Sequence, residues 1–355
     1  MSETEKGKTL PHVTFHVVNS VKGGSGKSTV SLLLAASIES NPTHKAYIID
    51  LDINGTSWNA NYKNILQFGR SGGGETGVPN SMRIFLNDLM LDYEGKSTQG
   101  IFARLPVLVP PERSSEPSQQ EFIEICLSNP DVQENINEVE LDLFENTIYK
   151  IVRQIYSSNT SKSIEQSLEH LHIILDMPPS YEQHAEKILN HLLLDSSSEL
   201  VKSVEKREDP FDTYKPYKVD LIMLSAISMA HVEHNKKYII SLFRNQKISS
   251  RLLQLIKEKR FIIRFWLNCV NVSSDYLQKN DTVLRDSIRA TLDIDALPRS
   301  KFPGLSGEVE QMLKSMGKTY FVCPHLDDDW TMQAFSASWE DSVKLKSMIP
   351  EGNIT

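Results

Sequence analysis

A glycine-rich stretch near the start of the chain has the residue types and the spacing that phosphate binding requires. Residues 22–29 read KGGSGKST, so three glycines stand just ahead of a lysine and two hydroxyl side chains. An apolar run at 13–18 precedes them and a helix-forming run at 30–37 follows, which predicts a strand, a loop and a helix in that order. Glycines let backbone N–H groups turn toward phosphates, and a helix N-terminus adds a partial positive charge. The residues predicted to bind a nucleotide here are Gly23, Gly24, Ser25, Gly26, Lys27, Ser28 and Thr29.

Two side chains of this loop would have separate tasks. The Lys27 ammonium would reach the β- and γ-phosphates, and the Ser28 hydroxyl would ligate Mg²⁺. The alternative is a tight surface turn that contains a lysine and three glycines.

Carboxylates stand where two further buried strands would end. Asp50 and Asp52 come at the end of the apolar run 46–51, and Asp176 directly follows the run 171–175. Open parallel sheets bind ligands beyond the carboxyl ends of their strands, and Mg²⁺ takes oxygen ligands. The predicted metal ligands are therefore Ser28, Asp50, Asp52 and Asp176. The alternative is that these carboxylates only cap or solvate their loops.

These motifs occur in the order found in one family of ATPases. The general phosphate-loop pattern begins with glycine, but residue 21 is valine, and a second lysine, Lys22, stands five residues before Lys27. This form, K-G-G-x-G-K-[ST], resembles the deviant Walker A motif of the ParA/MinD family. The segments DLDING at 50–55 and IILDMPP at 173–179 are similar to the switch I segment and to the Walker B motif with switch II.

The resemblance implies ATP and Mg²⁺ as cofactors, and catalytic roles for Lys22, Lys27 and Asp52. Lys22 would cross the interface of a homodimer to the phosphates of the other subunit, and Asp52 would orient the attacking water; the alternative for Lys22 is a solvated lysine. Asn268 and Pro324 stand where adenine-contacting segments of the family end their strands. No aspartate follows Asn268 in the register that guanine recognition uses, which favours ATP over GTP.

Charge is distributed unevenly along the 355 residues, whose formal net charge is −8. Residues 112–145 hold ten acidic residues and one basic residue, whereas residues 236–264 hold nine basic residues and one acidic residue. The basic segment is suited to nonspecific contact with DNA phosphates, and the family resemblance favours that interpretation over an ordinary solvated helix face. The predicted DNA-binding residues are Lys236, Lys237, Arg251, Lys257, Lys259 and Arg260.

Short apolar runs alternate with helix-forming segments along most of the chain. The predicted strands are 12–19, 46–51, 105–109, 171–175, 219–224, 261–267 and 319–323. Runs without period-2 alternation are typical of parallel strands that are covered on both faces. We expect an α/β fold of the P-loop NTPase class (SIMIBI-like), with a doubly wound, mostly parallel sheet flanked by helices. We expect one domain over residues 1–355, with insertions near 59–104, 112–136 and 195–216.

The remaining features indicate a cytoplasmic protein. Three widely spaced cysteines suit a reducing compartment, and no apolar run is long enough to span a membrane or to act as a signal peptide. We expect ordinary polar roles, and no metal site, for His170, His172, His184, His231, His234 and Asp327–Asp329.

The function predicted from these features is that of a dimerising switch ATPase of ParA type. It would bind DNA nonspecifically, associate with the nucleoid, and segregate or position plasmid or chromosomal cargo. Its hydrolysis of ATP would be slow and stimulated by an adaptor protein. The alternatives are a MinD-like membrane-positioning ATPase and a P-loop enzyme of the amidoligase or synthetase type. The segment Trp339–Ile349 lacks the long apolar face of a membrane-binding helix, so a membrane partner is disfavoured.

Overall fold

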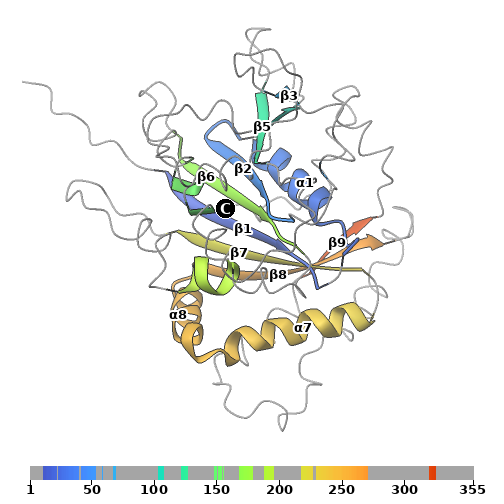
Figure 1. Cartoon of the computed structure of the whole chain (residues 1–355), viewed down its shortest axis with the longest axis vertical. Coiled ribbons are helices and arrows are strands. Elements are labelled where there is room, and N and C mark those ends of the chain that lie inside the picture. The colour runs from blue at the N-terminus through green and yellow to red at the C-terminus, as the bar shows by residue number, and fades with distance from the viewer. Residues whose placement is uncertain are drawn as a thin grey trace, which may run out of the picture.

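One mixed sheet with helices on both faces forms the described part of the molecule (Figure 1). The computed structural model describes residues 11–21, 23–39, 41–52, 58, 67–68, 103–107, 121–126, 148–149, 151–153, 155, 168–178, 188–195, 217–226, 229–270 and 320–324. Nearly all of the predicted insertion at 195–216, and the segment 339–349, lie outside these residues.

Nine strands form the sheet, in the order β3-β4-β5-β2-β6-β1-β7-β8-β9. Their bounds are β1 (His12–Asn19), β2 (His44–Asp50), β3 (Gln67–Phe68), β4 (Ala103–Val107), β5 (Glu121–Cys126), β6 (His170–Asp176), β7 (Lys218–Ala226), β8 (Phe261–Val270) and β9 (Tyr320–Pro324). From β5 to β9 every pair of neighbouring strands is parallel. The prediction of a doubly wound, mostly parallel α/β sheet is confirmed.

The β3 end of the sheet differs from the expectation. The apolar run at 105–109 corresponds to β4, which covers 103–107 and lies antiparallel to both β3 and β5. β5 falls inside the predicted insertion at 112–136, yet it pairs in parallel with β2 and buries Ile123 and Ile125 completely. Acidic composition favours a loop at this stretch, but pairing with β2 makes it a strand.

The two faces of the sheet are covered by different helices. Helices α7 (Met229–Arg244) and α8 (Gln246–Lys257) contribute to the main hydrophobic core, together with η2 (Ile188–Leu194), a π-helical segment. The strands supply alternate residues to this core, for example Val13, Phe15 and Val17 of β1. Helix α1 (Lys27–Glu39) packs against β2, β6 and β1, and Figure 1 shows it on the side of the sheet away from α7 and α8. This coverage explains the continuous apolar runs in the sequence.

Helix α8 ends in a Schellman motif that carries a lysine where glycine is usual. The Arg260 N–H donates to the Leu255 carbonyl at 2.7 Å, and the Lys259 N–H donates to the Ile256 carbonyl at 3.0 Å. These are the two hydrogen bonds that define the motif. Lys259 has a φ of 57°, a left-handed conformation that costs a non-glycine residue about 1–2 kcal/mol.

Lys259→Gly should therefore stabilise the protein. Glycine removes the left-handed strain but gives the unfolded chain more freedom, so the expected net gain in the free energy of unfolding is about 0.5–1 kcal/mol. Urea unfolding of the two proteins measures the difference. Lys257→Gly places glycine inside the last turn of α8 instead, and should destabilise by about 1 kcal/mol. A Lys259→Gly variant that is less stable than the wild type would contradict this account of the turn.

Candidate nucleotide site

The carboxyl ends of three neighbouring strands meet at the start of the glycine loop. In the sheet register, Val18 of β1 lies beside Asp176 of β6, and Asp176 lies beside Asp50 of β2. Backbone hydrogen bonds continue beyond the strands, because the Met177 N–H donates to the Val18 carbonyl at 3.1 Å and the Leu51 N–H donates to the Asp176 carbonyl at 3.0 Å. The loop from β1 to α1 therefore leaves the sheet at the edge where both aspartates stand.

Two glycines give this loop its backbone shape. Gly24 has a φ of 70° and Gly26 a φ of 80°, values that glycine adopts without strain. A Cβ at Gly24 would meet no atom within 4 Å, so the backbone conformation, and not crowding, requires glycine there. The Gly26 carbonyl accepts a helical hydrogen bond from the Val30 N–H at 3.0 Å, and the N-terminus of α1 therefore lies at the loop.

The predicted nucleotide-binding residues of the loop differ in exposure. Gly23 and Gly24 are exposed, Ser25 and Lys27 are buried, and Gly26, Ser28 and Thr29 are half-buried. Lys22 lies outside the described residues, so its predicted position at a dimer interface stays a prediction.

A buried asparagine of α7 attaches the loop to the sheet. Asn235 is 1% exposed. Its amide donates to the Leu224 carbonyl of β7 at 2.8 Å, and its Oδ1 accepts from the Val21 N–H at 3.4 Å. One side chain thus holds the start of the loop against β7. The sequence analysis missed this residue because 214 positions separate it from Val21 and no motif marks it.

Asp176 lies at the centre of the site and is 1% exposed. Burial raises its pKa to about 6; hydrogen bonds from Ser28 and Trp58 and the positive charge of Lys27 oppose this increase, and the charge of Asp52 adds to it. Trp58 donates from Nε1 to Asp176 Oδ2 at 2.8 Å and is itself buried. The sequence analysis missed Trp58, but the other three contacts join residues that it selected.

Asp50 and Asp52 stand beside this carboxyl group. Asp50, the last residue of β2, is 4% exposed, and its Oδ1 accepts a hydrogen bond from the Asp52 N–H at 3.1 Å. Asp52 is half-buried and close enough to Asp176 to act on its pKa. The structure therefore brings together all four residues that the sequence predicts as metal ligands.

These residues fit Mg²⁺. A serine hydroxyl and carboxylates are the hard oxygen ligands that the ion prefers. Asp176 Oδ1 is buried and has no hydrogen-bond partner among the described residues, although a buried carboxylate oxygen normally has one. A cation bound there, held by Asp176 and Ser28, would satisfy this oxygen. Lys27 beside it supplies positive charge for a phosphate group.

The predicted adenine-contacting positions lie on neighbouring strands. Asn268 is on β8, which continues to Val270, slightly past the end at Asn268 that the sequence suggests. Val270 pairs with Pro324, the last residue of β9, after an irregularity in the register. The backbone therefore brings the two positions to the same part of the sheet.

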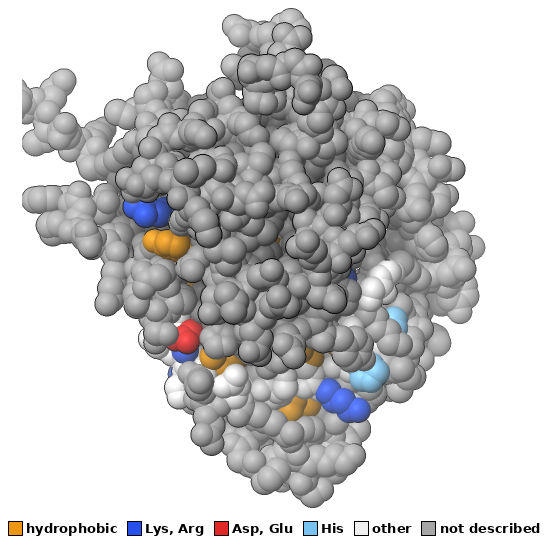
Figure 2. Space-filling view, viewed as in Figure 1, with side chains coloured by type: hydrophobic (Ala, Val, Ile, Leu, Met, Phe, Trp, Pro, Cys, Tyr) orange, Lys and Arg blue, Asp and Glu red, His pale blue; other side chains and the backbone are white. Residues whose placement is uncertain are grey.

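The predicted DNA-binding residues separate into two groups. Lys237, Lys257 and Lys259 are exposed, and the side chain of Lys236 is not among those that the structure describes. On the face drawn in Figure 2, Lys or Arg and His side chains lie together in the region of α7. Among the described residues, no helix is both long and apolar enough to cross a membrane.

The two remaining predicted DNA-binding residues, Arg251 and Arg260, form hydrogen bonds within the protein. Arg260 is 8% exposed; it donates from Nε to the Tyr217 carbonyl at 2.9 Å and pairs with Glu258 at 2.8 Å. Arg251 is half-buried and donates to Gln254 at 3.1 Å. The predicted contact of Arg260 with DNA stays a prediction, and it would require this side chain to leave its structural contacts.

The histidines also differ from the expectation. His170 and His172 of β6, predicted to be ordinary polar residues, gather with His44 of β2 in a group whose potential ligand atoms lie within 4.8 Å of one another. His44 was not among the candidates. The signal that the sequence offered was the spacing of two residues between His170 and His172, which places both on one face of a strand.

Comparisons with known proteins find similar structures. No protein-family model matches the chain, and no curated protein matches it. The chain is similar to the ParA family ATPase from Chlorobium tepidum TLS, with 14% identity, 94% of each chain covered and a TM-score of 0.45. It is similar to a chain of the MinC:MinD cell division protein complex from Aquifex aeolicus, with 11% identity, coverage of 95% of this chain and 93% of that chain, and a TM-score of 0.39.

A cobyrinic acid a,c-diamide synthase from Mycobacterium smegmatis with bound ADP and magnesium is also similar, with 14% identity, coverage of 78% of this chain and 82% of that chain, and a TM-score of 0.39.

Asp176→Asn should stabilise the ligand-free protein at neutral pH. The pKa of Asp176 is about 6 in the folded protein against an ordinary value of 3.8, so ionisation of this carboxyl opposes folding. The free energy of unfolding of the wild type should fall as the pH rises through this interval, by an amount on the order of 2–3 kcal/mol. The variant should lack this decrease. Urea unfolding in EDTA, repeated at several pH values between about 4 and 7, measures the difference.

Glu169→Gln is the matched control, because it removes an exposed carboxylate just before the other end of β6. Its stability should stay within about 0.5 kcal/mol of the wild type at neutral pH. Equal pH dependence in the wild type and in Asp176→Asn would show that the buried carboxyl does not carry this penalty.

Proposed function

We propose that this protein is an ATP-hydrolysing switch that dimerises when it binds ATP and Mg²⁺. The observation that carries the proposal is the meeting of Lys27 and Ser28 with the buried Asp176 at the carboxyl edge of the sheet. A lysine, a hydroxyl group and a carboxylate are the groups that hold a nucleoside triphosphate with its metal ion in P-loop enzymes.

Each of these residues has a definite part in the proposal. The loop N–H groups and the N-terminus of α1 would face the phosphates, and Lys27 would neutralise charge that develops during transfer of the γ-phosphoryl group. Bound Mg²⁺ would supply further positive charge at the phosphate oxygens. Asp52, which is half-buried just beyond the carboxyl end of β2, would orient the attacking water.

Dimerisation and DNA binding extend this proposal. Lys22 would reach the phosphates of a second subunit, so that two chains close over their nucleotides. The exposed lysines of α7 and α8 would contact DNA phosphates without sequence preference. Hydrolysis, slow until an adaptor protein stimulates it, would release the dimer from DNA. Such a cycle in the cytoplasm, on the nucleoid, would segregate or position a plasmid or chromosomal cargo.

The oligomeric state of the protein with ATP and with ADP tests the proposed nucleotide-dependent dimerisation. With ATP and Mg²⁺ the wild type should elute from a size-exclusion column as a dimer, and with ADP as a monomer. Lys27→Ala should bind no nucleotide and stay monomeric, because it lacks the phosphate-neutralising charge. Asp52→Ala should stay dimeric with ATP, because turnover should fall about 10²–10⁴-fold without its water-orienting carboxylate.

Lys45→Ala is the control for Lys27→Ala, since Lys45 is a lysine of β2 that pairs with Glu39 at 3.1 Å. It should dimerise as the wild type does. An ATP-loaded wild type that remains monomeric would contradict the switch, and ATP turnover that requires an additional small substrate would indicate a synthetase instead.

Charge reversal tests the DNA contact. Lys257→Glu should weaken binding to DNA equally for unrelated sequences, and should reduce the dependence of log affinity on log salt by about one unit. Arg153→Glu is the matched control, because Arg153 is an exposed cation on another helical segment and the change in net charge is the same. Gel shift assays at several salt concentrations measure both effects. Equal losses of DNA affinity in the two variants would mean that the net charge of the protein, and not the position of Lys257, governs DNA binding.

A further inference from the structure

The histidine group lies at the end of the sheet opposite the nucleotide site. His12, His170 and His44 are register neighbours at the starts of β1, β6 and β2. His172 follows two residues later on the same face of β6 as His170. His170 and Asp176 are the first and last residues of β6, which puts them about 20 Å apart along the strand.

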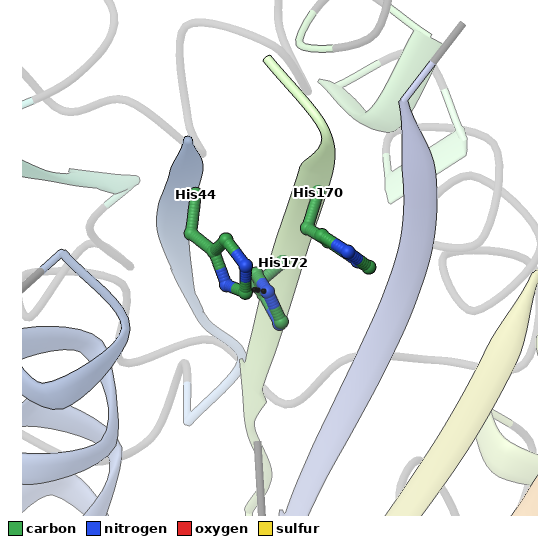
Figure 3. A group of neighbouring side chains, drawn as sticks. All are labelled: His44, His170 and His172. Atoms are coloured by element: carbon green, nitrogen blue, oxygen red, sulfur yellow. Dashed lines mark hydrogen bonds between the residues drawn. The ribbon is translucent and has the colours of Figure 1, made fainter. Parts of the chain in front are cut away.

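Two of the imidazoles are already at a spacing that suits a shared metal ion. His172 Nε2 and His44 Nδ1 are 3.1 Å apart, and Figure 3 shows the two rings next to each other, from neighbouring strands. Two nitrogen ligands at about 2.0–2.1 Å from a tetrahedral zinc ion are about 3.3 Å apart. The ring centres of His170 and His44 are 4.5 Å apart, and all three ligand atoms lie within 4.8 Å of one another.

A row of polar side chains fixes the orientation of the His172 ring. The row, called here the cross-strand row, takes one residue from each of five neighbouring strands: Arg264, Asp220, His16, His172 and His44. Arg264 Nε donates to Asp220 Oδ1 at 2.8 Å, and Asp220 Oδ2 lies 3.1 Å from His16 Nδ1. His16 Nε2 in turn lies 2.9 Å from His172 Nδ1.

The tautomers along this row follow from the chemistry of its ends. A carboxylate only accepts hydrogen bonds, so His16 donates from Nδ1 to Asp220, and the neutral ring accepts at Nε2. His172 must then donate from Nδ1 to His16, so its Nε2 accepts a hydrogen bond from His44 Nδ1. A metal ion would replace this hydrogen bond once the His44 proton is on Nε2 instead. Metal-binding histidines in proteins are held in this way, with the second ring nitrogen donating to an acceptor behind it.

We propose that His44, His170 and His172 bind a divalent transition-metal ion of the zinc class. Three neutral imidazoles are suitable ligands for zinc, and they leave a fourth position for water or another ligand. His170 would move inward to complete the site. His44 and His170 are half-buried at the first residues of β2 and β6, which gives an ion access from the amino ends of these strands. The bound ion would join the starts of β2 and β6, the two strands that carry Asp50 and Asp176 at their other ends.

Charge and burial around the group are compatible with this site. His172 is 1% exposed and His44 is half-buried, so an ion bound between them would be largely shielded from water. Lys218 places positive charge near His172, whereas Glu169 places negative charge near His44. Asp220 adds a second carboxylate within the cross-strand row.

Direct measurement of metal binding tests the proposal. Full-length protein is freed of transition metals with a chelator and then titrated with Zn²⁺ by calorimetry, in excess Mg²⁺ so that the oxygen ligands at the nucleotide site are occupied. We expect one Zn²⁺ per chain, a higher melting temperature with Zn²⁺, and the visible spectrum of tetrahedral Co²⁺ when cobalt replaces zinc. His44→Ala and His170→Ala should each weaken Zn²⁺ binding by more than about 100-fold, since removing a ligand costs more than the 10–100-fold of an outer partner.

Two further variants distinguish a metal site from a purely hydrogen-bonded row. His16→Gln removes only the partner behind His172, and should weaken Zn²⁺ binding by about 10–100-fold. His234→Ala removes a half-buried histidine of α7 and should bind Zn²⁺ as the wild type does. The proposal is overturned if the wild type binds no Zn²⁺, or if its binding survives both His44→Ala and His170→Ala. In either case the row is a hydrogen-bonded element of the core.

Discussion

A carboxylate buried at the end of β6 is the main physical constraint on this molecule. Asp176 is almost inaccessible to water, and burial outweighs the hydrogen bonds and the lysine charge that act on it, so its pKa lies near 6. At neutral pH the ligand-free protein therefore carries an unfavourable negative charge in its interior. A cation bound with the nucleotide would compensate that charge, and the free energy of binding would include the relief of this penalty.

The two ends of the same strands offer different ligand chemistry. At the carboxyl ends stand carboxylates and a serine hydroxyl, which are hard oxygen donors suited to Mg²⁺. At the amino ends stand imidazoles, which are suited to ions of the zinc class. Mg²⁺ would therefore bind poorly at the imidazoles. β2 and β6 contribute to both groups, so the positions of these two strands determine the geometry of both sites.

The sequence predicted the parts of the structure that depend on local order. The loop at 22–29 and the aspartates at strand ends are short motifs whose neighbours in the chain already indicate a strand or a helix. Trp58, Asn235 and the histidine group escaped prediction because their partners lie far away in the sequence. The burial of Arg260 escaped prediction for a related reason: composition marks it as basic, but only the turn after α8 shows that it is buried and bonded to Tyr217. β5 required its pairing with β2 to be recognised.

Register connects the two ends of the sheet. A slip of one residue in a strand would turn its side chains to the opposite face, so the cross-strand row can form only if β2, β6, β1, β7 and β8 keep their observed register. Misplacing Asp220 or His16 against the hydrophobic core would leave a polar group without a partner there, at a cost of about 1–3 kcal/mol for each group. The same register puts Asp50 beside Asp176. The polar row at one end of the sheet therefore helps to specify the alignment of the aspartates at the other.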